Sequence, residues 1–234
     1  NQLVQAPFRL KSYTQDEQGK KYPQRNIYVK VDKYFRDFLH NPNAQDRWII
    51  IPGLRGVGKT TILAQLFLNH QQEVGDRRML YVSLDEVVNV LGSSLKDVLN
   101  AYEKIIGESF EKLTEPVFIF IDEAQYDPKW ASVLKSVYDR SNKVFVACSG
   151  SSAVSLQTNP DVIRRSIFQK LFPTSFSEFL MIRDGRLPIK GLKQNIKDAL
   201  FNADSAKDAY EKLKKYEQSV VSAWSSLDRH YVDE

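Results

Sequence analysis

Cysteine and histidine are scarce in this chain of 234 residues, which holds a single cysteine, Cys148, and three histidines, His40, His70 and His230. A single cysteine cannot build a disulfide framework or a cysteine-based zinc site. The histidines are scattered and show no spacing typical of metal ligands. These absences favour a reducing compartment, and we expect a cytoplasmic location.

Long apolar runs are also absent. No stretch of the sequence reaches the roughly 18 residues of a membrane span, and the amino terminus lacks the basic and then apolar segments of an export signal. With 42% hydrophobic and 26% charged residues, the composition is that of an ordinary globular domain. Because the chain begins with Asn1 and stops at Glu234 just after a strongly patterned helix, we expect a further carboxyl-terminal partner domain.

Charge of one sign is not in large excess, since the formal net charge is +4. The basic residues are unevenly distributed along the chain, however, and the segment 155–198 carries eight Lys/Arg against four Asp/Glu. A solvated surface of mixed sign is the ordinary explanation of such a segment. DNA is therefore a weakly supported partner.

Apolar runs rich in β-branched or aromatic residues alternate with helical patterns along the chain. Runs without polar alternation suit strands that are buried on both faces of a parallel sheet. They occupy residues 48–51, 79–84, 117–121 and 144–148, and a fifth short strand is expected at 167–172. This order predicts right-handed βαβ units in a doubly wound α/β sheet.

The ends of the chain differ from this core. Residues 1–24 are expected to form an amino-terminal arm, extended in conformation, before a first helix at 31–39. The core is predicted to span 25–183. Helical patterns at 175–183, 191–202 and 207–227 then predict that 184–234 form a small helical lid or the start of another domain.

The stretch 53–60 reads GLRGVGKT and fits G-x-x-x-x-G-K-[ST], with an apolar strand before it and an amphipathic helix after it. Glycines let such a loop aim its N–H groups at phosphate, and the helix amino terminus adds positive potential. Lys59 is predicted to reach the β- and γ-phosphates and Thr60 to bind Mg²⁺. The expected nucleotide-binding residues of the loop are Gly53, Leu54, Arg55, Gly56, Val57, Gly58, Lys59, Thr60 and Thr61.

Two acids follow an apolar strand in VFIFIDEAQ, residues 117–125. A strand that ends in an acid delivers a carboxylate to the carboxyl edge of a parallel sheet, beside the phosphate loop. Asp122 is predicted to hold Mg²⁺. Glu123 can orient and deprotonate the water that attacks the γ-phosphate, which is the chemistry of a hydrolase.

Other candidates come from the flanking segments. In KVFVACSGSS a strand runs out into small polar residues, and Ser149, with Ser151 as the reserve, is predicted to contact the γ-phosphate or the lytic water. Arg164 and Arg165 precede the fifth expected strand, and either can stabilise transition-state charge.

Two residues near the start of the core are candidates for the base of the nucleotide. Arg25 and Asn26 precede the first expected helix, at the place where folds of this kind hold adenine.

Four segments in order, namely 53–61, FIDEAQYDPKWASVLKSVYD, VACSGSS and FPTSFSEFL, together resemble the AAA+ superfamily of P-loop ATPases, and more narrowly a prokaryotic branch of it. The resemblance covers about 25–183. It implies a three-layer αβα core with a five-stranded parallel sheet in the order 5-1-4-3-2 and a helical lid. By the same resemblance, Ser149 matches the sensor position of strand four, and the arginine before strand five maps onto Arg164 or Arg165.

Competing functions make different demands on the sequence. A GTPase would need N-K-x-D, but Asn142-Lys143 is followed by Val144 and Phe145. A helicase needs two linked ATPase lobes, and Glu123 is unwelcome in a small-molecule kinase because it activates water.

We therefore expect a Mg²⁺-dependent ATPase, with ATP and ADP as ligands, that moves its lid or an appended domain. The alternative is a slow nucleotide-dependent switch that binds a protein or DNA partner, and homo-oligomer formation stays open.

Overall fold

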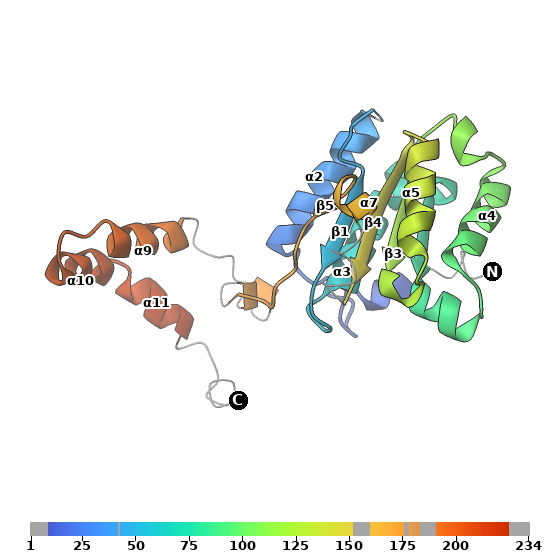
Figure 1. The fold of residues 1–234 in the computed structure, drawn as a ribbon. Helices are drawn as coiled ribbons and strands as arrows, with labels where there is room; N and C mark the ends of the chain where they lie inside the picture. The colour runs from blue at the N-terminus through green and yellow to red at the C-terminus, as the bar shows by residue number, and fades with distance from the viewer. Residues whose placement is uncertain are drawn as a thin grey trace. The chain divides into compact units, whose positions relative to one another are not determined.

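Five parallel strands form the sheet in the computed structural model, which describes residues 9–41, 43–151, 160–175, 178–179, 181–182 and 191–224 (Figure 1). The strands are β1 (Trp48–Pro52), β2 (Met79–Ser83), β3 (Val117–Asp122), β4 (Val144–Gly150) and β5 (Ile167–Phe168). Their spatial order is β2-β3-β4-β1-β5, and all four pairings are parallel. This confirms the predicted order 5-1-4-3-2 and the α/β class.

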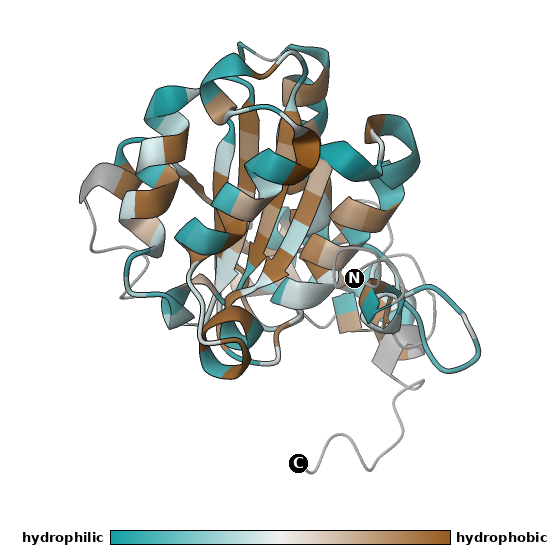
Figure 2. Ribbon diagram, turned by 90° about the vertical axis from the view of Figure 1, so that its right-hand side faces the viewer, coloured by the Kyte–Doolittle hydropathy of each residue, from teal (hydrophilic) through white to brown (hydrophobic). Residues whose placement is uncertain are grey.

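Successive residues of each strand point to opposite faces of the sheet. Both faces are apolar, and helices cover both. Ile49 and Ile51 pack with α2 (Asn26–His40) and α3 (Lys59–Val74) in a core rich in phenylalanine. Trp48 and Ile50 pack on the other face with α4 (Leu95–Ile106) and α5 (Trp130–Arg140). Figure 2 shows the hydrophobic strands between helices whose outer sides are hydrophilic. The result is the predicted three-layer αβα core.

Short elements complete the connections between the main ones. They are a π-helical turn η2 (Glu86–Val90), the 3-10 turns η1 (Asp76–Arg78), η3 (Phe110–Lys112) and η4 (Ala124–Tyr126), and the short helix α7 (Pro160–Ile163). Of these, η4 follows β3 directly and begins just after Glu123. It therefore shapes the exit of the strand that carries both predicted acids.

The amino-terminal arm differs from the extended form that the sequence predicts. Residues 9–12 are helical, and Leu10 is buried in the same core as α2 and α3. Burial of this one apolar side chain favours the helical turn. The next helix, α2, begins at Asn26 instead of residue 31.

The fifth strand is shorter than predicted, with two residues in place of 167–172. Its hydrogen bonding to β1 nevertheless continues, because the Gln169 N–H donates to the Ile50 carbonyl and the Leu171 N–H to the Pro52 carbonyl, both at 2.8 Å. The edge of the sheet thus stays joined up to the start of the phosphate loop.

The chain divides into two compact units, 1–173 and 174–234. In the second, the Ser175 hydroxyl and the Glu178 carboxylate cap each other's main chain at the start of a helical turn. The unit continues with α9 (Leu192–Phe201), α10 (Ala206–Lys214) and α11 (Glu217–Trp224). The limits proposed for the core, 25–183, and for the lid, 184–234, stay predictions.

One helix of the second unit is wrong in the sequence-based prediction. The expected continuous helix at 207–227 is divided into α10 and α11, because the Tyr216 N–H bonds the Leu213 carbonyl at 2.8 Å and closes a tighter turn than an α-helix has. Residues 176–177, 180 and 183 of the predicted helix 175–183, and 225–227 of this one, lie outside the described residues.

Candidate functional site

The loop 53–58 turns from β1 into α3 with two glycines in the left-handed region. Gly56 has φ +81° and Gly58 has φ +94°, and a Cβ added at either would meet nothing within 4 Å. Only glycine adopts this conformation at low cost, and the open space leaves room for a ligand against the backbone. Leu54 and Arg55 are exposed at the tip of the loop, whereas Val57 is partly buried.

Gly53 is required for a different reason. A Cβ at this position would lie 2.5 Å from the carbonyl oxygen of Leu171, which is closer than real contacts allow. The residue also forms a parallel bridge with Leu171 at the end of the β1–β5 pairing. Gly53 therefore sets the point at which the chain leaves the sheet to form the loop.

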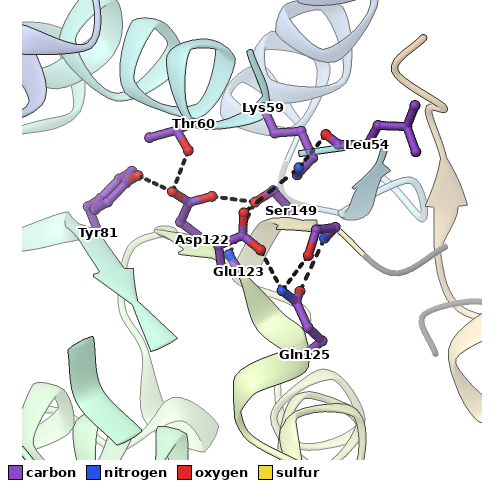
Figure 3. Close-up of polar contacts among 9 residues, drawn as sticks. Leu54, Lys59, Thr60, Tyr81, Asp122, Glu123, Gln125 and Ser149 are labelled. Carbon is purple, nitrogen blue, oxygen red and sulfur yellow. Dashed lines mark hydrogen bonds and ion pairs between the residues drawn. The ribbon is translucent and has the colours of Figure 1, made fainter. Parts of the chain in front are cut away.

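Lys59, Thr60 and Thr61 open α3, whose amino terminus points its free N–H groups into the loop. The Lys59 side chain is 3% exposed, and its Nζ donates to the Leu54 carbonyl at 2.9 Å. The Thr60 hydroxyl donates to Asp122 Oδ2 at 2.7 Å (Figure 3). The structure thus joins the two predicted motifs, which are 62 residues apart in sequence.

Three hydroxyl groups from three elements surround the Asp122 carboxylate (Figure 3). Besides Thr60, the Tyr81 hydroxyl of β2 donates to Oδ2 at 3.2 Å and the Ser149 hydroxyl of β4 donates to Oδ1. Burial, followed by the nearby Asp122 charge, raises the pKa of Tyr81 well above 10, so its hydroxyl keeps its proton at neutral pH. The carboxylate is therefore held in one orientation beside the phosphate loop.

Glu123 has a strained backbone. Among the described residues it alone has a positive φ without being glycine, with φ 54° and ψ 51°. This conformation turns its side chain back toward the loop, where Oε1 lies 3.8 Å from Lys59 Nζ. Its other carboxylate oxygen, Oε2, accepts a hydrogen bond from the Gln125 amide. Strain at a non-glycine residue of this kind is concentrated at functional sites.

Ser149 is fully buried, and its hydroxyl also accepts the Glu123 N–H at 3.2 Å. It therefore holds both acids in place. Ser151, the reserve candidate, lies beside Gln125, whose Nε2 donates to the Ser151 hydroxyl at 2.8 Å. Which of the two serines contacts phosphate stays a prediction.

Arg25 and Asn26 lie at the start of α2. The Arg25 guanidinium is buried, and it donates to the Val57 carbonyl at 2.7 Å and to the Phe172 carbonyl at 3.0 Å. It therefore ties the phosphate loop to the segment after β5. Asn26 is exposed as the first residue of the helix.

The two arginines before β5 are not brought to the phosphate loop of the same chain. Arg165 donates to both carboxylate oxygens of Asp139, at 3.0 and 3.4 Å, and Arg164 is exposed. Asp139 lies in the last turn of α5, which runs antiparallel to the strands, so this pair sits at the amino edge of the sheet.

Tyr81 and Gln125 are site residues that the sequence reasoning did not assign. Gln125 belongs to the segment FIDEAQ, and its closeness to Glu123 in the sequence was a signal for a place in the site. Nothing in the sequence indicated which side chains it would contact. The position of Tyr81 follows from the register between β2 and β3, which pairs Tyr81 with Phe120, two residues before Asp122. That register is not readable from either strand alone.

The αβα fold, the glycine loop and the paired acids are together the features of an AAA-type domain of the P-loop class. A model of the AAA domain family matches residues 45–180, which is more than half of the chain. The chain therefore belongs to the AAA domain family. Among the helices of its described part, none combines the length and apolar character needed to cross a membrane.

Among curated proteins, the chain is 33% identical over 221 residues to the uncharacterized protein MJ1637 of Methanocaldococcus jannaschii, a match that covers 91% of this chain and 42% of that protein. The chain thus spans less than half the length of this relative. Similar solved structures include PCH-2 of C. elegans, with 16% identity, TM-score 0.48 and coverage of 75% and 52% of the two chains. Another is the Aeropyrum pernix ORC2 protein in ADPNP and ADP complexes, with 14% identity, TM-score 0.47 and coverage of 74% and 55%.

Proposed function

We propose that this chain binds ATP and hydrolyses it in the presence of Mg²⁺, and that turnover moves the helical segment after the core or an appended domain. One observation carries the proposal: at the exit of β3, Lys59 Nζ lies 3.8 Å from Glu123 Oε1 and the Thr60 hydroxyl donates to Asp122 Oδ2 at 2.7 Å. A lysine, a hydroxyl and two acids at this point provide groups for phosphate, metal and water.

The residues present fit both ligands. The open space at Gly56 and Gly58 and the amino terminus of α3 suit a phosphate chain. Thr60 Oγ1 and the Asp122 carboxylate are oxygen ligands of the type that Mg²⁺ prefers. Within the described ranges no cluster of three or more acidic, histidine or cysteine side chains could hold a metal by itself. The remaining ligands of Mg²⁺ would therefore come from phosphate oxygens and water, as in other sites of this class.

The chemistry we propose divides the work among the side chains. The Glu123 carboxylate accepts a proton from a water molecule while the water oxygen bonds to the γ-phosphorus and the bond to the β–γ bridging oxygen breaks. Lys59 leaves the Leu54 carbonyl and compensates negative charge on the phosphates. Bound Mg²⁺ would supply further charge compensation at the β- and γ-phosphates. Ser149 keeps both acids oriented.

Two assignments in this proposal concern other parts of the molecule. Arg25 and Asn26 are assigned to the nucleotide, Arg25 through its bond to the Val57 carbonyl of the loop. Arg165 is assigned to transition-state charge, and because it lies at the amino edge it would act on the nucleotide of a second copy of the chain.

The experiment compares Glu123→Gln and Lys59→Ala with wild type, measuring phosphate release and the binding of a fluorescent ATP analogue. Glu123→Gln is expected to bind the analogue but to lose roughly 10²–10⁴ of the turnover, the usual contribution of a general base. Lys59→Ala is expected to lose binding. The control is Glu17→Gln, the same chemical change at an exposed turn, which should behave as wild type. Equal turnover in Glu123→Gln and wild type would remove the water-activation role.

A further inference from the structure

The Gln125 side chain makes three hydrogen bonds, of which one stays at the exit of β3 and two reach the exit of β4 (Figure 3). Its Nε2 donates to Glu123 Oε2 and to the Ser151 hydroxyl, the latter at 2.8 Å. Its Oε1 accepts the Ser151 N–H at 3.3 Å. From these contacts we propose that Gln125 is a positioning residue for Glu123, an inference that rests on the proposed ATPase function.

The orientation of the Gln125 amide is decided by chemistry. The Ser151 main-chain N–H can only donate, so the amide oxygen must face it, and the ionised Glu123 carboxylate can only accept, so the amide nitrogen must face that side. If the amide were flipped, both contacts would become repulsive. A glutamine, but not a glutamate, satisfies both neighbours at once.

The bond from Gln125 keeps Glu123 apart from Lys59. The distance of 3.8 Å between Glu123 Oε1 and Lys59 Nζ exceeds the roughly 2.7–2.9 Å of a charge-assisted hydrogen bond. Without the amide, the carboxylate can rotate onto the ammonium group and form a close ion pair. Such a pair would withdraw the water-activating carboxylate and the phosphate-binding lysine from their roles together.

Ser151 holds the Gln125 amide in a fixed orientation through two hydrogen bonds. Ser151 follows β4 (Val144–Gly150), whose residue Ser149 already holds Asp122 and the Glu123 N–H. Residues at the end of β4 thus hold both parts of Glu123: Ser149 holds its main chain, and Ser151 holds its carboxylate through Gln125. Among the described residues, the Gln125 side chain bonds Glu123 and Ser151 and not the phosphate loop, so its effect on turnover passes through Glu123.

The test uses three variants with ATP and Mg²⁺. Gln125→Glu keeps the shape and an acceptor for the Ser151 N–H but loses the donor and places a second carboxylate against Glu123. Gln125→Met keeps the length and removes all the hydrogen bonds. Ser151→Ala removes one anchor and leaves the main-chain bond in place.

We expect kcat to fall roughly 10- to 100-fold in both Gln125 variants, the size of effect that small misplacements of catalytic groups have, while the equilibrium Kd for ATP stays within about twofold. Ser151→Ala should lose less of kcat than either. In a Glu123→Gln background, Gln125→Glu should cause no further loss, because both changes act on one unit.

The outcomes separate this inference from the function on which it rests. If wild type turns over ATP, Glu123→Gln does not, and Gln125→Glu has the wild-type kcat, the positioning role is overturned and the ATPase proposal stands. A fall in kcat accompanied by a lower Tm and weaker ATP binding would also overturn it, since a residue with a purely structural role would give that result. If wild type itself shows no turnover, the proposed function fails and this inference fails with it.

Discussion

The amino edge of the sheet and the phosphate loop at its carboxyl edge differ in how closely their charged side chains are paired. At the amino edge, arginine side chains meet carboxylates: Arg78 lies 2.6 Å from Glu108, Arg165 lies 3.0 Å from Asp139, and Arg140 pairs with Glu111. At the carboxyl edge, Lys59 is bonded to a loop carbonyl and stands 3.8 Å from the nearest carboxylate. The carboxyl edge also has one matched pair, Arg9 with Glu86 after β2, so the incompletely paired charge there is that of Lys59 in the phosphate loop.

Backbone strain differs between the edges at one residue. Glycines with positive φ lie at both edges, at 56 and 58 on the carboxyl side and at 75 and 107 on the amino side, whereas the one described non-glycine residue with positive φ is Glu123 at the carboxyl edge. Strain and incompletely paired charge both lower the stability of the fold, and they persist where the surrounding structure enforces them. Substitutions at the amino edge should therefore change stability and spare turnover, with the exception of Arg165, which we assign to the nucleotide of a second copy. Substitutions at the carboxyl edge should do the reverse.

The largest stability effect is expected at Arg47, just before β1. Its buried guanidinium donates to the Tyr138 carbonyl at 2.9 Å and the Val144 carbonyl at 3.2 Å, and it lies 3.6 Å above the Tyr138 ring. Burial lowers the pKa of Arg47 from its usual value, but the group stays charged at neutral pH. We expect Arg47→Met to lower the free energy of unfolding by roughly 2–4 kcal/mol, because two hydrogen bonds to a charged donor are lost.

Urea denaturation measures this change, and Lys143→Met is its matched control. Lys143 lies at the same edge, and its Nζ donates to the Thr114 carbonyl at an exposed position, so we expect a loss below about 1 kcal/mol. Phosphate release below the unfolding transition should be unchanged in both. Reduced turnover by folded Arg47→Met protein would contradict the division between the edges.

A smaller effect on stability is expected at Glu123, where one substitution relieves backbone strain instead of removing a contact. Asparagine tolerates the left-handed conformation better than glutamate does, so Glu123→Asn should be more stable than Glu123→Gln, by about 1 kcal/mol. Both variants lack the carboxylate and should lose turnover. Thermal unfolding of the two proteins side by side makes the comparison, and an Asn variant no more stable than the Gln variant would show that the backbone stores no strain there.

The sheet and the phosphate loop could be predicted from the sequence because each rests on local signals. Apolar runs buried on both faces mark the strands, and the spacing of glycine, lysine and threonine marks the loop. The strand order came from a family resemblance, since periodicity does not encode which strands are neighbours. The helical arm at Leu10 was missed because its conformation depends on burial against α2 and α3.

The contacts that complete the site were less predictable, because they join distant segments. The two carbonyl partners of Arg25 lie 32 and 147 residues away. Tyr81 reaches Asp122 across strands, and Gln125 reaches Ser151 between two strand exits. Each of these contacts depends on loop geometry or strand register that a single sequence does not determine.

The smallest stability effect is expected for the Arg165–Asp139 pair, whose side chains are 25% and 46% exposed. Exposed pairs contribute roughly 0.2–1 kcal/mol, so Asp139→Asn and Arg165→Ala should each destabilise the fold by less than about 1 kcal/mol. Their turnover should differ: Asp139→Asn keeps it, whereas Arg165→Ala loses it if the guanidinium serves the nucleotide of a second copy. Mixing Arg165→Ala with Lys59→Ala should then restore activity, because the Lys59→Ala chain supplies Arg165 to an intact site. Full turnover by Arg165→Ala alone would place this arginine with the structural pairs of the amino edge.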